Sequence, residues 1–428
     1  MRAPTALIVE PESSGTELIP SAIGLGLSVR VVDRRPLHLL PAPVRKAVEA
    51  GTAVHDRVDT RSADAVADLA AALAGRETVA AVVPGFEYAV PVVAAAAARL
   101  GLPGIDPTTA EVLRDKRKMK HALAAAGVPV ARGVPISAHH GGEAACRRAA
   151  DLVGFPAVLK PVNGSGSLGV RRVDDHTELL DHVQGSRLAP MDDMGLWLGE
   201  SLLLESYVRG PEFSVEGYAC DGVPHVVAVT QKQLGPEPHF VETGHVVDPG
   251  LARRVRTELE DVAVAAVRAL GMDVGAFHLE ARLTSEGPVV IEVAARLGGD
   301  HIQRLVALAH GVDLPAAMLR VLSGRPVPPP AAGESGRVAG VRFFTVPDPA
   351  TLGEPRRLEE LTGALDGCLE AKVTVGSDAL LVPATDFRGR FGHAVFAAPD
   401  RQSLDRAFAE VDELITTAVK VERPLCIS

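Results

Sequence analysis

The first hundred residues alternate short apolar runs with amphipathic stretches of helical period. Residues 6–9 form a buried-strand run, a Ser/Gly loop follows at 13–15, and a helical stretch to about Leu27 leads into a second strand, 28–32, that ends at Asp33. Further helices are expected at 63–74 and 90–100, with a strand near 79–83. This alternation predicts a doubly wound α/β domain built on a parallel sheet.

The loop after the first strand, residues 10–16, lies where open α/β sheets bind ligands. It lacks the GxGxxG pattern, so a dinucleotide site is not supported. Glu10 and Ser14 are candidate substrate contacts, although we favour a capped turn.

The middle of the chain changes to hairpin-like signals. Residues 106–127 are predicted to form a helix that carries the basic run 115–120 and ends at Gly127. Apolar residues 155–160 then end at Lys160, followed by the glycine-rich NGSGSLG, 163–169, and a returning strand, 170–173. A glycine-rich loop with a lysine at its base brings N–H groups and positive charge close to phosphate oxygens. No GK[ST] closes it, so it is not a P-loop, and a flexible hairpin tip is an equal alternative.

After a loop at 184–199, several strands are expected before a long helix. Strand 201–208 runs into a hinge at Gly210-Pro211, which makes it a candidate backbone edge for an adenine base. The further elements are strands 212–218 and 226–230, a polar loop 236–248, an amphipathic helix 251–270 and a helix 300–310. Glu242 and His245 lie in the polar loop as candidate contacts, although loops collect polar residues by default.

Two apolar runs, 276–283 and 289–295, flank the turn signal TSEGP at 284–288 and predict a β-hairpin. If the turn centres on Glu286, Glu280 lies opposite Glu292 and His278 lies opposite Ala294, with Arg296 on the same face. Two facing carboxylates repel each other unless a cation separates them, and a hard divalent ion such as Mg²⁺ suits oxygen ligands. The alternative is an exposed face on which both acids are hydrated.

The last hundred residues begin with a Pro/Gly/Ser linker, 326–336, and continue as a mixed α/β unit. Asp386, Arg388, Arg390 and His393 cluster near two glycines there. We favour a structural turn for this cluster, with a subunit contact or a nucleotide edge as the alternative.

Composition narrows the class of partner. The 428 residues are 47% hydrophobic and 23% charged, with a net charge of −10 and no long basic run, so neither nucleic acid nor an anionic membrane is an expected partner. Four scattered cysteines form no ligand or disulfide pattern, and the first ten residues hold only a four-residue apolar run. We therefore expect a cytoplasmic protein.

Five motifs stand in a fixed order: Asp115-Lys116 opening a helix that ends in AGVP, FPAVLKP, NGSGSLG, LLESYVRGPEFSVE, and Glu280 with EVAARLGGD at 292–300. This order resembles the ATP-grasp superfamily, and within it the carboxylate–amine ligases related to bacterial L-amino acid ligases. The resemblance covers roughly residues 5–420. It implies an N-terminal doubly wound domain (1–114), a small ATP-grasp lobe (115–200), a large lobe (201–325) and a C-terminal α+β unit (337–428).

The resemblance also implies roles for individual residues. Lys116 and Lys160 would contact ATP phosphates, while the loop with Ser165 and Gly166 would close over them. The remaining implied roles are a backbone edge for adenine at Glu205, Ser206, Tyr207 and Val208, a ribose contact at Glu212, Mg²⁺ ligands at Glu280 and Glu292 with Mn²⁺ as a substitute, and stabilisation of the acyl phosphate by Arg296. Glu242, His245, His278, Gly298 and Asp300 are tentative substrate contacts, and Glu242, His245 and Asp300 are also candidate bases.

One position departs from the family pattern Glu-x-Asn-x-Arg. Ala294 stands where the Asn oxygen would bind a metal, which puts a second Mg²⁺ in doubt. His278 is expected directly across from Ala294, so we hypothesise that it fills the vacancy as a ligand or a substrate contact. The alternative is a half-buried strand histidine with a backbone partner.

These implications predict an ADP-forming ligase that joins a small carboxylic acid to an amine through an acyl phosphate, in primary metabolism or in a peptide-like natural-product pathway. An ATP-grasp carboxylase or a nucleotide-precursor ligase is the first alternative. A nucleotide-binding scaffold without turnover is the second. The resemblance also implies a homodimer, which is common in the family.

Overall fold

The computed structural model describes residues 3–73, 76–137, 142–186, 201–329 and 336–421. Most of the loop expected at 184–199, part of the linker expected at 326–336, and Cys426 lie outside the described residues. The chain divides into two compact units: the first holds Met1–Val130, Ser214–Val229 and Ala252–Glu334, and the second holds Ala131–Phe213, Thr230–Leu251 and Ser335–Ser428. The four predicted domain ranges stay a prediction.

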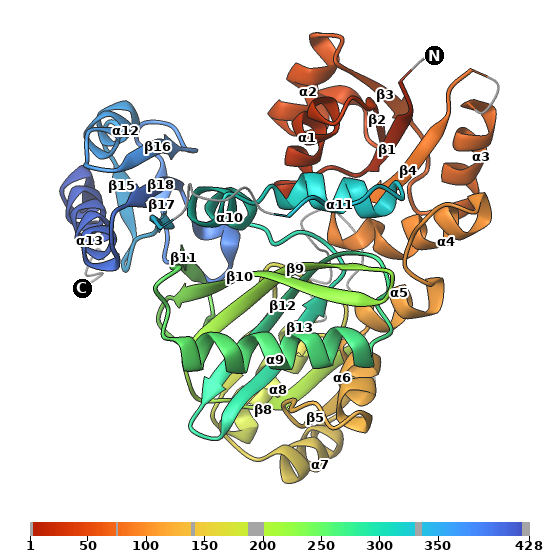
Figure 1. The fold of residues 1–428 in the computed structure, drawn as a ribbon. Helices are drawn as coiled ribbons and strands as arrows, with labels where there is room; N and C mark the ends of the chain where they lie inside the picture. The colour runs from red at the N-terminus through yellow and green to blue at the C-terminus, as the bar shows by residue number, and fades with distance from the viewer. Residues whose placement is uncertain (1–2, 74–75, 138–141, 187–200, 330–335, 422–428) are drawn as a thin grey trace, which may run out of the picture. The chain divides into compact units, whose positions relative to one another are not determined.

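The N-terminal part of the first unit is a parallel sheet of order β3-β2-β1-β4, with helices on both faces (Figure 1). Its elements are β1 (Thr5–Val9), η1 (Ser13–Glu17), α1 (Leu18–Gly24), β2 (Ser28–Asp33), η2 (Leu37–Leu39), α2 (Ala42–Glu49), β3 (Ala53–Arg57), α3 (Ala63–Leu73), β4 (Val79–Pro84), η3 (Glu87–Ala89) and α4 (Val90–Leu100). All five residues of β1 are buried, as a strand covered on both faces requires. The predicted doubly wound domain is confirmed.

The loops that follow β1 and β4 approach each other closely. A Cβ atom on Gly15 would lie 1.8 Å from the carbonyl oxygen of Gly85, and a Cβ atom on Gly85 would lie 2.6 Å from the Cα atom of Pro11. Only glycine fits at these two positions. The two loops therefore form one packed edge at the carboxyl ends of adjacent strands.

The single helix predicted at 106–127 is wrong, because the structure forms two helices, α5 (Pro107–Arg114) and α6 (Lys116–Ala125). Asp115 separates them in an extended conformation, φ −108° and ψ 104°. Its carboxylate accepts hydrogen bonds from the N–H groups of Arg117 and Lys118, so it acts as the N-cap of α6. The motif prediction that Asp115-Lys116 opens a helix is confirmed.

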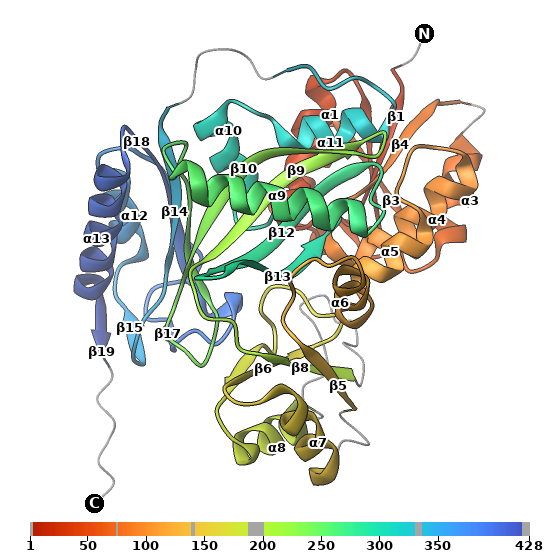
Figure 2. The same ribbon diagram turned by 60° about the horizontal axis from the view of Figure 1, so that its bottom comes forward.

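The rest of the first unit is built on strands of order β13-β12-β9-β10, crossed by α9 (Figure 2). The elements are β9 (Glu212–Cys220), β10 (Val223–Leu234), α9 (Arg253–Ala269), β12 (Gly275–Thr284), β13 (Gly287–Ala294), α10 (Ile302–His310) and α11 (Leu314–Leu322). The division between the units falls inside β9 and β10. The helix expected at 300–310 begins two residues later, because Asp300 and His301 both have positive φ, 54° and 64°.

The register of the predicted hairpin is confirmed at its acidic end. His278 pairs with Ala294 and Glu280 pairs with Glu292. The predicted turn centre at Glu286 is wrong, because Thr284 pairs with Gly287 and only two residues form the turn. A register shift after Glu280 leaves one extra residue on β13, and this bulge brings the two glutamates opposite each other.

The second unit contains an antiparallel sheet of order β5-β8-β6-β7 beside α7 and α8, and strands of order β10-β11-β14-β18-β16 beside α12 and α13. The elements of the first group are β5 (Gly133–Ser137), α7 (Glu143–Val153), β6 (Ala157–Pro161), β7 (Arg171–Val173), α8 (His176–Gly185) and β8 (Ser201–Ser206). Those of the second are β11 (Glu242–Val247), β14 (Val338–Phe344), β15 (Ala350–Leu352), α12 (Pro355–Gly363), β16 (Cys368–Val373), β17 (Leu380–Leu381), η5 (Phe387–Gly389), β18 (Gly392–Ala398), α13 (Arg401–Ala418) and β19 (Val419–Val421). Strand β7 returns along β6 as predicted.

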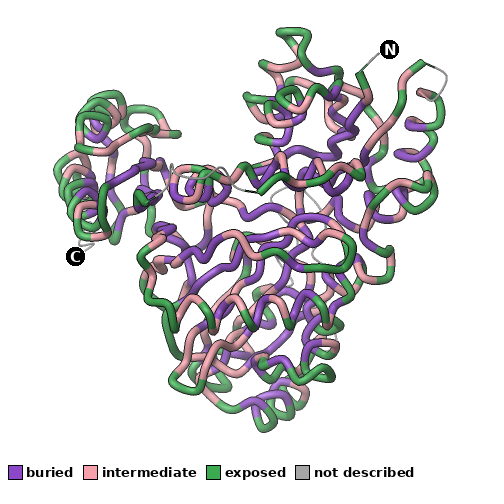
Figure 3. The backbone as a smooth tube through the Cα atoms, viewed as in Figure 1, coloured by how far each residue is buried: buried purple, intermediate pink, exposed green. Residues whose placement is uncertain are grey.

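The polar loop expected at 236–248 is wrong in its second half, because β11 pairs with both β10 and β14. The sequence of β11, ETGHVV, holds only two apolar residues and therefore gives no clear strand pattern. As Figure 3 shows, the buried residues concentrate in the strands of each unit. Within the described residues, no single helix is long and apolar enough to span a membrane, and α10 with α11 meets that test only as a pair bent by 103°.

Candidate functional site

In the first unit, the hairpin of β12 and β13 brings a residue predicted to contact ATP phosphates close to the predicted Mg²⁺ ligands. Lys116 Nζ lies 2.8 Å from Glu292 Oε1, which places the first residue of α6 against the acidic end of β13. Glu280 pairs with Glu292 across the two strands. Glu292 therefore has Lys116 as its cationic neighbour, and Glu280 has His278.

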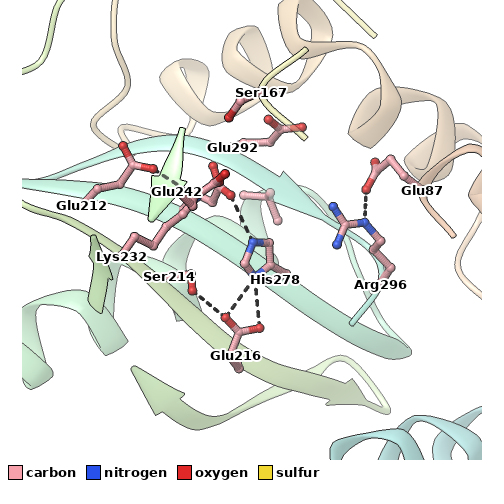
Figure 4. A network of polar contacts seen from close by, with 12 residues as sticks. Glu87, Ser167, Glu212, Ser214, Glu216, Lys232, Glu242, His278, Glu292 and Arg296 are labelled. Atoms are coloured by element: carbon pink, nitrogen blue, oxygen red, sulfur yellow. Dashed lines mark hydrogen bonds and ion pairs between the residues drawn. The ribbon is translucent and has the colours of Figure 1, made fainter. Parts of the chain in front are cut away.

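His278 lies on the face that the sequence predicted, but its neighbours are carboxylates. Its Nδ1 lies 2.9 and 3.0 Å from the two oxygens of Glu216, and its Nε2 lies 3.2 Å from Glu280 Oε1. Ser214 Oγ donates to Glu216 Oε1 at 2.7 Å, and this hydrogen bond helps to fix the carboxylate that pairs with His278 (Figure 4). Burial alone would lower the pKa of His278, but Glu216 and Glu280 outweigh it and raise the pKa to about 9. At neutral pH the ring is an imidazolium that donates to both acids, and the alternative of a backbone-bonded histidine is not what the structure has.

Arg296 follows β13, and its side chain points toward Glu87 (Figure 4). Its Nε donates to Glu87 Oε2, and its Nη1 donates to the carbonyl oxygen of Leu297 at 2.8 Å. Glu87 also accepts from Arg114 Nη1 at 2.7 Å. Burial alone would raise the pKa of Glu87, but Arg296, Arg114 and Lys116 outweigh it and lower the pKa to about 2.

The depressed pKa of Glu87 predicts a pH-dependent stability. Because the folded pKa, about 2, lies below the ordinary value of 4.5, the contribution is complete above pH 4.5 and is lost as pH falls toward 2. The shift corresponds to about 3 kcal/mol. We expect the difference in unfolding free energy between wild type and Glu87→Gln, measured by urea titration, to shrink by about 2 kcal/mol from pH 5 to 2.5, because the folded carboxyl is still mostly ionised at pH 2.5. A difference independent of pH would contradict it.

Gly298 and Asp300, the tentative substrate contacts, lie in the segment after Arg296. A Cβ atom on Gly298 would lie 2.9 Å from Glu216 Oε2 and 3.0 Å from His278 Nδ1, so glycine is required for this segment to pass the buried pair. Asp300 has a positive φ of 54° just before α10. Such strain in a non-glycine residue is typical of functional segments.

The second unit holds the other predicted lysine. Lys160 Nζ lies 2.8 Å from Glu205 Oε2, and both side chains are nearly inaccessible, at 4% and 3%. The residues of the predicted adenine edge continue from Glu205: Ser206 Oγ accepts from the N–H of Arg132 and Tyr207 N–H donates to the carbonyl of Pro156. Val208 follows the end of β8.

The glycine-rich loop bends at Gly166 and Ser167, whose φ angles are +61° and +59°. Ser167 Oγ donates to the carbonyl of Phe240 at 3.3 Å. A Cβ atom on Gly166 would lie 3.0 Å from the ring of Phe387, so the loop packs on the C-terminal part of the chain. Ser165 directly precedes this bend, and its phosphate contact stays a prediction.

Lys232 on β10 forms ion pairs with two predicted site residues. Its Nζ lies 3.1 Å from Glu212, the predicted ribose contact, and 3.1 Å from Glu242, a tentative substrate contact. Across the strands it pairs with His245, whose ring meets Phe343 edge-on at 5.7 Å. Glu212 and Glu242 thus lie around one buried cation, with His245 at the cross-strand position. In the predicted C-terminal turn, Asp386 caps η5 and accepts from Arg388, while His393 contacts Glu370.

Sequence reasoning missed Glu87, Arg114, Glu216 and Lys232 as site residues. A charged residue at an apolar position of a buried strand is the available signal for Glu216 and Lys232, because such a charge needs a partner. Glu87 and Arg114 carry no such signal, since both follow or end elements at positions where charges are ordinary.

The carboxylates at the hairpin are the candidate ligands of Mg²⁺. No group of three or more His, Cys, Asp or Glu side chains within the described residues is arranged to hold a metal ion. Mg²⁺ at phosphate sites, however, is held by one or two carboxylates together with substrate phosphates, and Glu280 and Glu292 supply two facing carboxylates. The residues present therefore fit a nucleotide-bound cation and do not form a cage for a free one.

Comparison with known proteins places the chain in a family. Residues 153–304 match a family model described as an ATP-grasp domain, and residues 19–104 match one described as an ATP-grasp N-terminal domain. An uncharacterized protein of Sinorhizobium fredii, y4rH, is 31% identical over 364 residues, which cover 85% of this chain and 73% of that protein. Carnosine synthase 1 of Homo sapiens is 30% identical over 257 residues, 56% of this chain but only 30% of the synthase.

Solved structures agree on the fold. An L-amino acid ligase from Bacillus licheniformis superposes with a TM-score of 0.77 at 24% identity, covering 99% of both chains. The biotin carboxylase domain of the Hydrogenobacter thermophilus 2-oxoglutarate carboxylase, solved with MgADP, ADP and bicarbonate, has a TM-score of 0.68 at 17% identity and covers 99% of this chain and 91% of that one. The chain belongs to the ATP-grasp family and has the ATP-grasp fold, and its predicted resemblance to L-amino acid ligases is confirmed. Its relatives indicate that it is an enzyme.

Proposed function

We propose that this protein is an ADP-forming carboxylate–amine ligase that joins an amino acid or a similar small acid to an amine or a second amino acid. The observation that carries the proposal is the convergence of Lys116, Glu280, Glu292 and Arg296 at the base of the hairpin, two cations beside two facing carboxylates. Such a set suits phosphoryl transfer, in which charge neutralisation and positioning supply most of the catalysis. The structural similarity to the L-amino acid ligase of Bacillus licheniformis supports amino acids as the substrate class.

The reaction has two steps. A carboxylate oxygen of the acid attacks the γ-phosphorus of ATP, so that ADP leaves and an acyl phosphate forms. The amine nitrogen then attacks the acyl carbon, the amide bond forms and inorganic phosphate leaves. Arg296 stabilises the negative charge of the acyl phosphate and of the tetrahedral intermediate, while the amine loses its proton to a base for which Glu242, His245 and Asp300 are the candidates.

The remaining residues bind the nucleotide. Lys116 and Lys160 neutralise phosphate charge, the loop with Ser165 and Gly166 covers the phosphates, Glu205 to Val208 present backbone groups to adenine, and Glu212 holds the ribose. Glu280 and Glu292 would hold Mg²⁺, or Mn²⁺ as a substitute, which when bound neutralises the ATP phosphates. His278 occupies the place beside Ala294 as a donor to Glu280.

The test is ADP release from ATP and Mg²⁺ with each amino acid alone, with pairs, and with bicarbonate. We expect release only with a pair, together with a product mass equal to the two amino acids minus water. Release with bicarbonate alone would favour the carboxylase that the 2-oxoglutarate carboxylase neighbour suggests. Tight ATP binding without ADP in any mixture would favour a scaffold without turnover and contradict the proposal.

A further inference from the structure

The ligand-binding edge of the N-terminal sheet is occupied by the protein itself. In the order β3-β2-β1-β4 the chain leaves β1 toward β2 on one side and returns at β4 on the other, so the loops after β1 and β4 flank a topological switch point. In open α/β sheets this is where ligands bind. Here Ser14, after β1, donates to the carbonyl of Leu297 at 3.3 Å, and Glu87, after β4, accepts from Arg296.

These contacts fix the guanidinium of Arg296 in two directions. Its Nε is held by Glu87 and its Nη1 by the carbonyl of Leu297, which Ser14 holds in turn. The guanidinium is planar, so two fixed nitrogens set the orientation of the third. Among the contacts that the described residues make, Nη2 is left for a ligand.

Glu87 is suited to this task because it is itself immobilised. Its side chain is 2% exposed, and Arg114 Nη1 holds its other oxygen at 2.7 Å. Arg114 is fixed in turn by the ring of Tyr88, which lies 4.9 Å below it. A buried carboxylate between two arginines cannot reorient without leaving charges unpaired.

We propose that Glu87 is the positioning residue of Arg296, so that the switch point of the N-terminal sheet serves to aim a catalytic side chain. The inference rests on the proposed function, because it takes Arg296 as the group that meets the acyl phosphate. It gives a residue of the N-terminal domain a role in the chemistry at Arg296.

The test begins with Glu87→Gln, which keeps the shape but removes the charge. We expect kcat to fall about 10²-fold, the cost of a small misplacement of a catalytic group, with the KM for ATP changed less than about threefold. Glu77→Gln is the matched control, because Glu77 forms an equally close pair with Arg30 on the same domain, away from Arg296. A loss of stability alone would affect both variants, whereas the kcat loss is expected only at Glu87.

A double-mutant cycle with Arg296→Lys completes the test. If Glu87 acts through Arg296, the double variant will have the kcat of Arg296→Lys alone. Independent, multiplicative losses would overturn the inference, as would an unchanged kcat in a folded Glu87→Gln. Because these outcomes require a wild-type enzyme that releases ADP, they are distinguishable from a failure of the proposed function, in which the wild type itself shows no turnover.

Discussion

Replacing Glu292 by Gln is expected to abolish ADP release while the protein stays folded. Glu292 faces Glu280 across the hairpin and contacts Lys116 at 2.8 Å, so it lies at the centre of the charges that would surround the ATP phosphates. Gln keeps the length and can still accept a hydrogen bond from Lys116, but it removes the charge that we propose holds a divalent cation. Loss of that cation costs several kcal/mol, and we expect turnover to fall at least about 10³-fold.

The matched control is Glu286→Gln, at the exposed turn of the same hairpin. It is expected to have wild-type turnover and stability. Binding of Mn²⁺ in the presence of ADP, followed by electron paramagnetic resonance, gives a readout that does not depend on turnover and should weaken only in Glu292→Gln. Near-normal rates of ADP release in Glu292→Gln would contradict a role for Glu292 in binding the divalent cation.

Replacing Lys160 by Ala is expected to have the second-largest effect, a rise of about 10²- to 10³-fold in the ATP concentration needed for half-maximal rate. Lys160 lies at the base of the glycine-rich loop with its side chain almost fully buried. Removing one partner of such a buried charged contact costs about 2–5 kcal/mol. An unchanged ATP dependence would mean that the loop does not bind phosphates.

The variant has a structural side effect that needs its own control. Lys160→Ala leaves Glu205 buried without its ion-pair partner, and this destabilises the fold. Lys160→Ala with Glu205→Ala removes both charges and should recover part of the stability while keeping the raised ATP requirement, because the proposed adenine contact at Glu205 is to its backbone. Lys118→Ala, at an exposed lysine of α6, should leave both properties unchanged.

Much of the fold was predictable because its signals are local. Apolar runs predicted β1, β2 and β4. The two apolar runs around the TSEGP turn predicted the hairpin in which Glu280 lies opposite Glu292. The failures have local causes as well. Asp115 divides a continuous helical pattern by capping the second half, and β11 was hidden because its pairing with β14 depends on residues far away in sequence.

The candidate site was predictable only where a motif carried it. The structure pairs Lys116 with Glu292 and His278 with Glu280 on a hairpin where the two glutamates lie opposite each other, and it pairs Lys160 with Glu205. Glu216 compensates His278, Lys232 compensates Glu212 and Glu242, and Glu87 compensates Arg296, with partners that lie from 10 to more than 200 positions away. Pairing of this kind is a property of the tertiary structure, which a single sequence does not reveal.

The central claim is that the acid is activated as an acyl phosphate, and transfer of oxygen isotope tests it most directly. The acid substrate, with ¹⁸O in both carboxylate oxygens, is incubated with ATP, Mg²⁺ and the amine, and the released phosphate is analysed by mass spectrometry. The account predicts one ¹⁸O atom in each inorganic phosphate, because the carboxylate oxygen that attacks the γ-phosphorus leaves with it. Unlabelled phosphate formed together with the amide product would contradict the account.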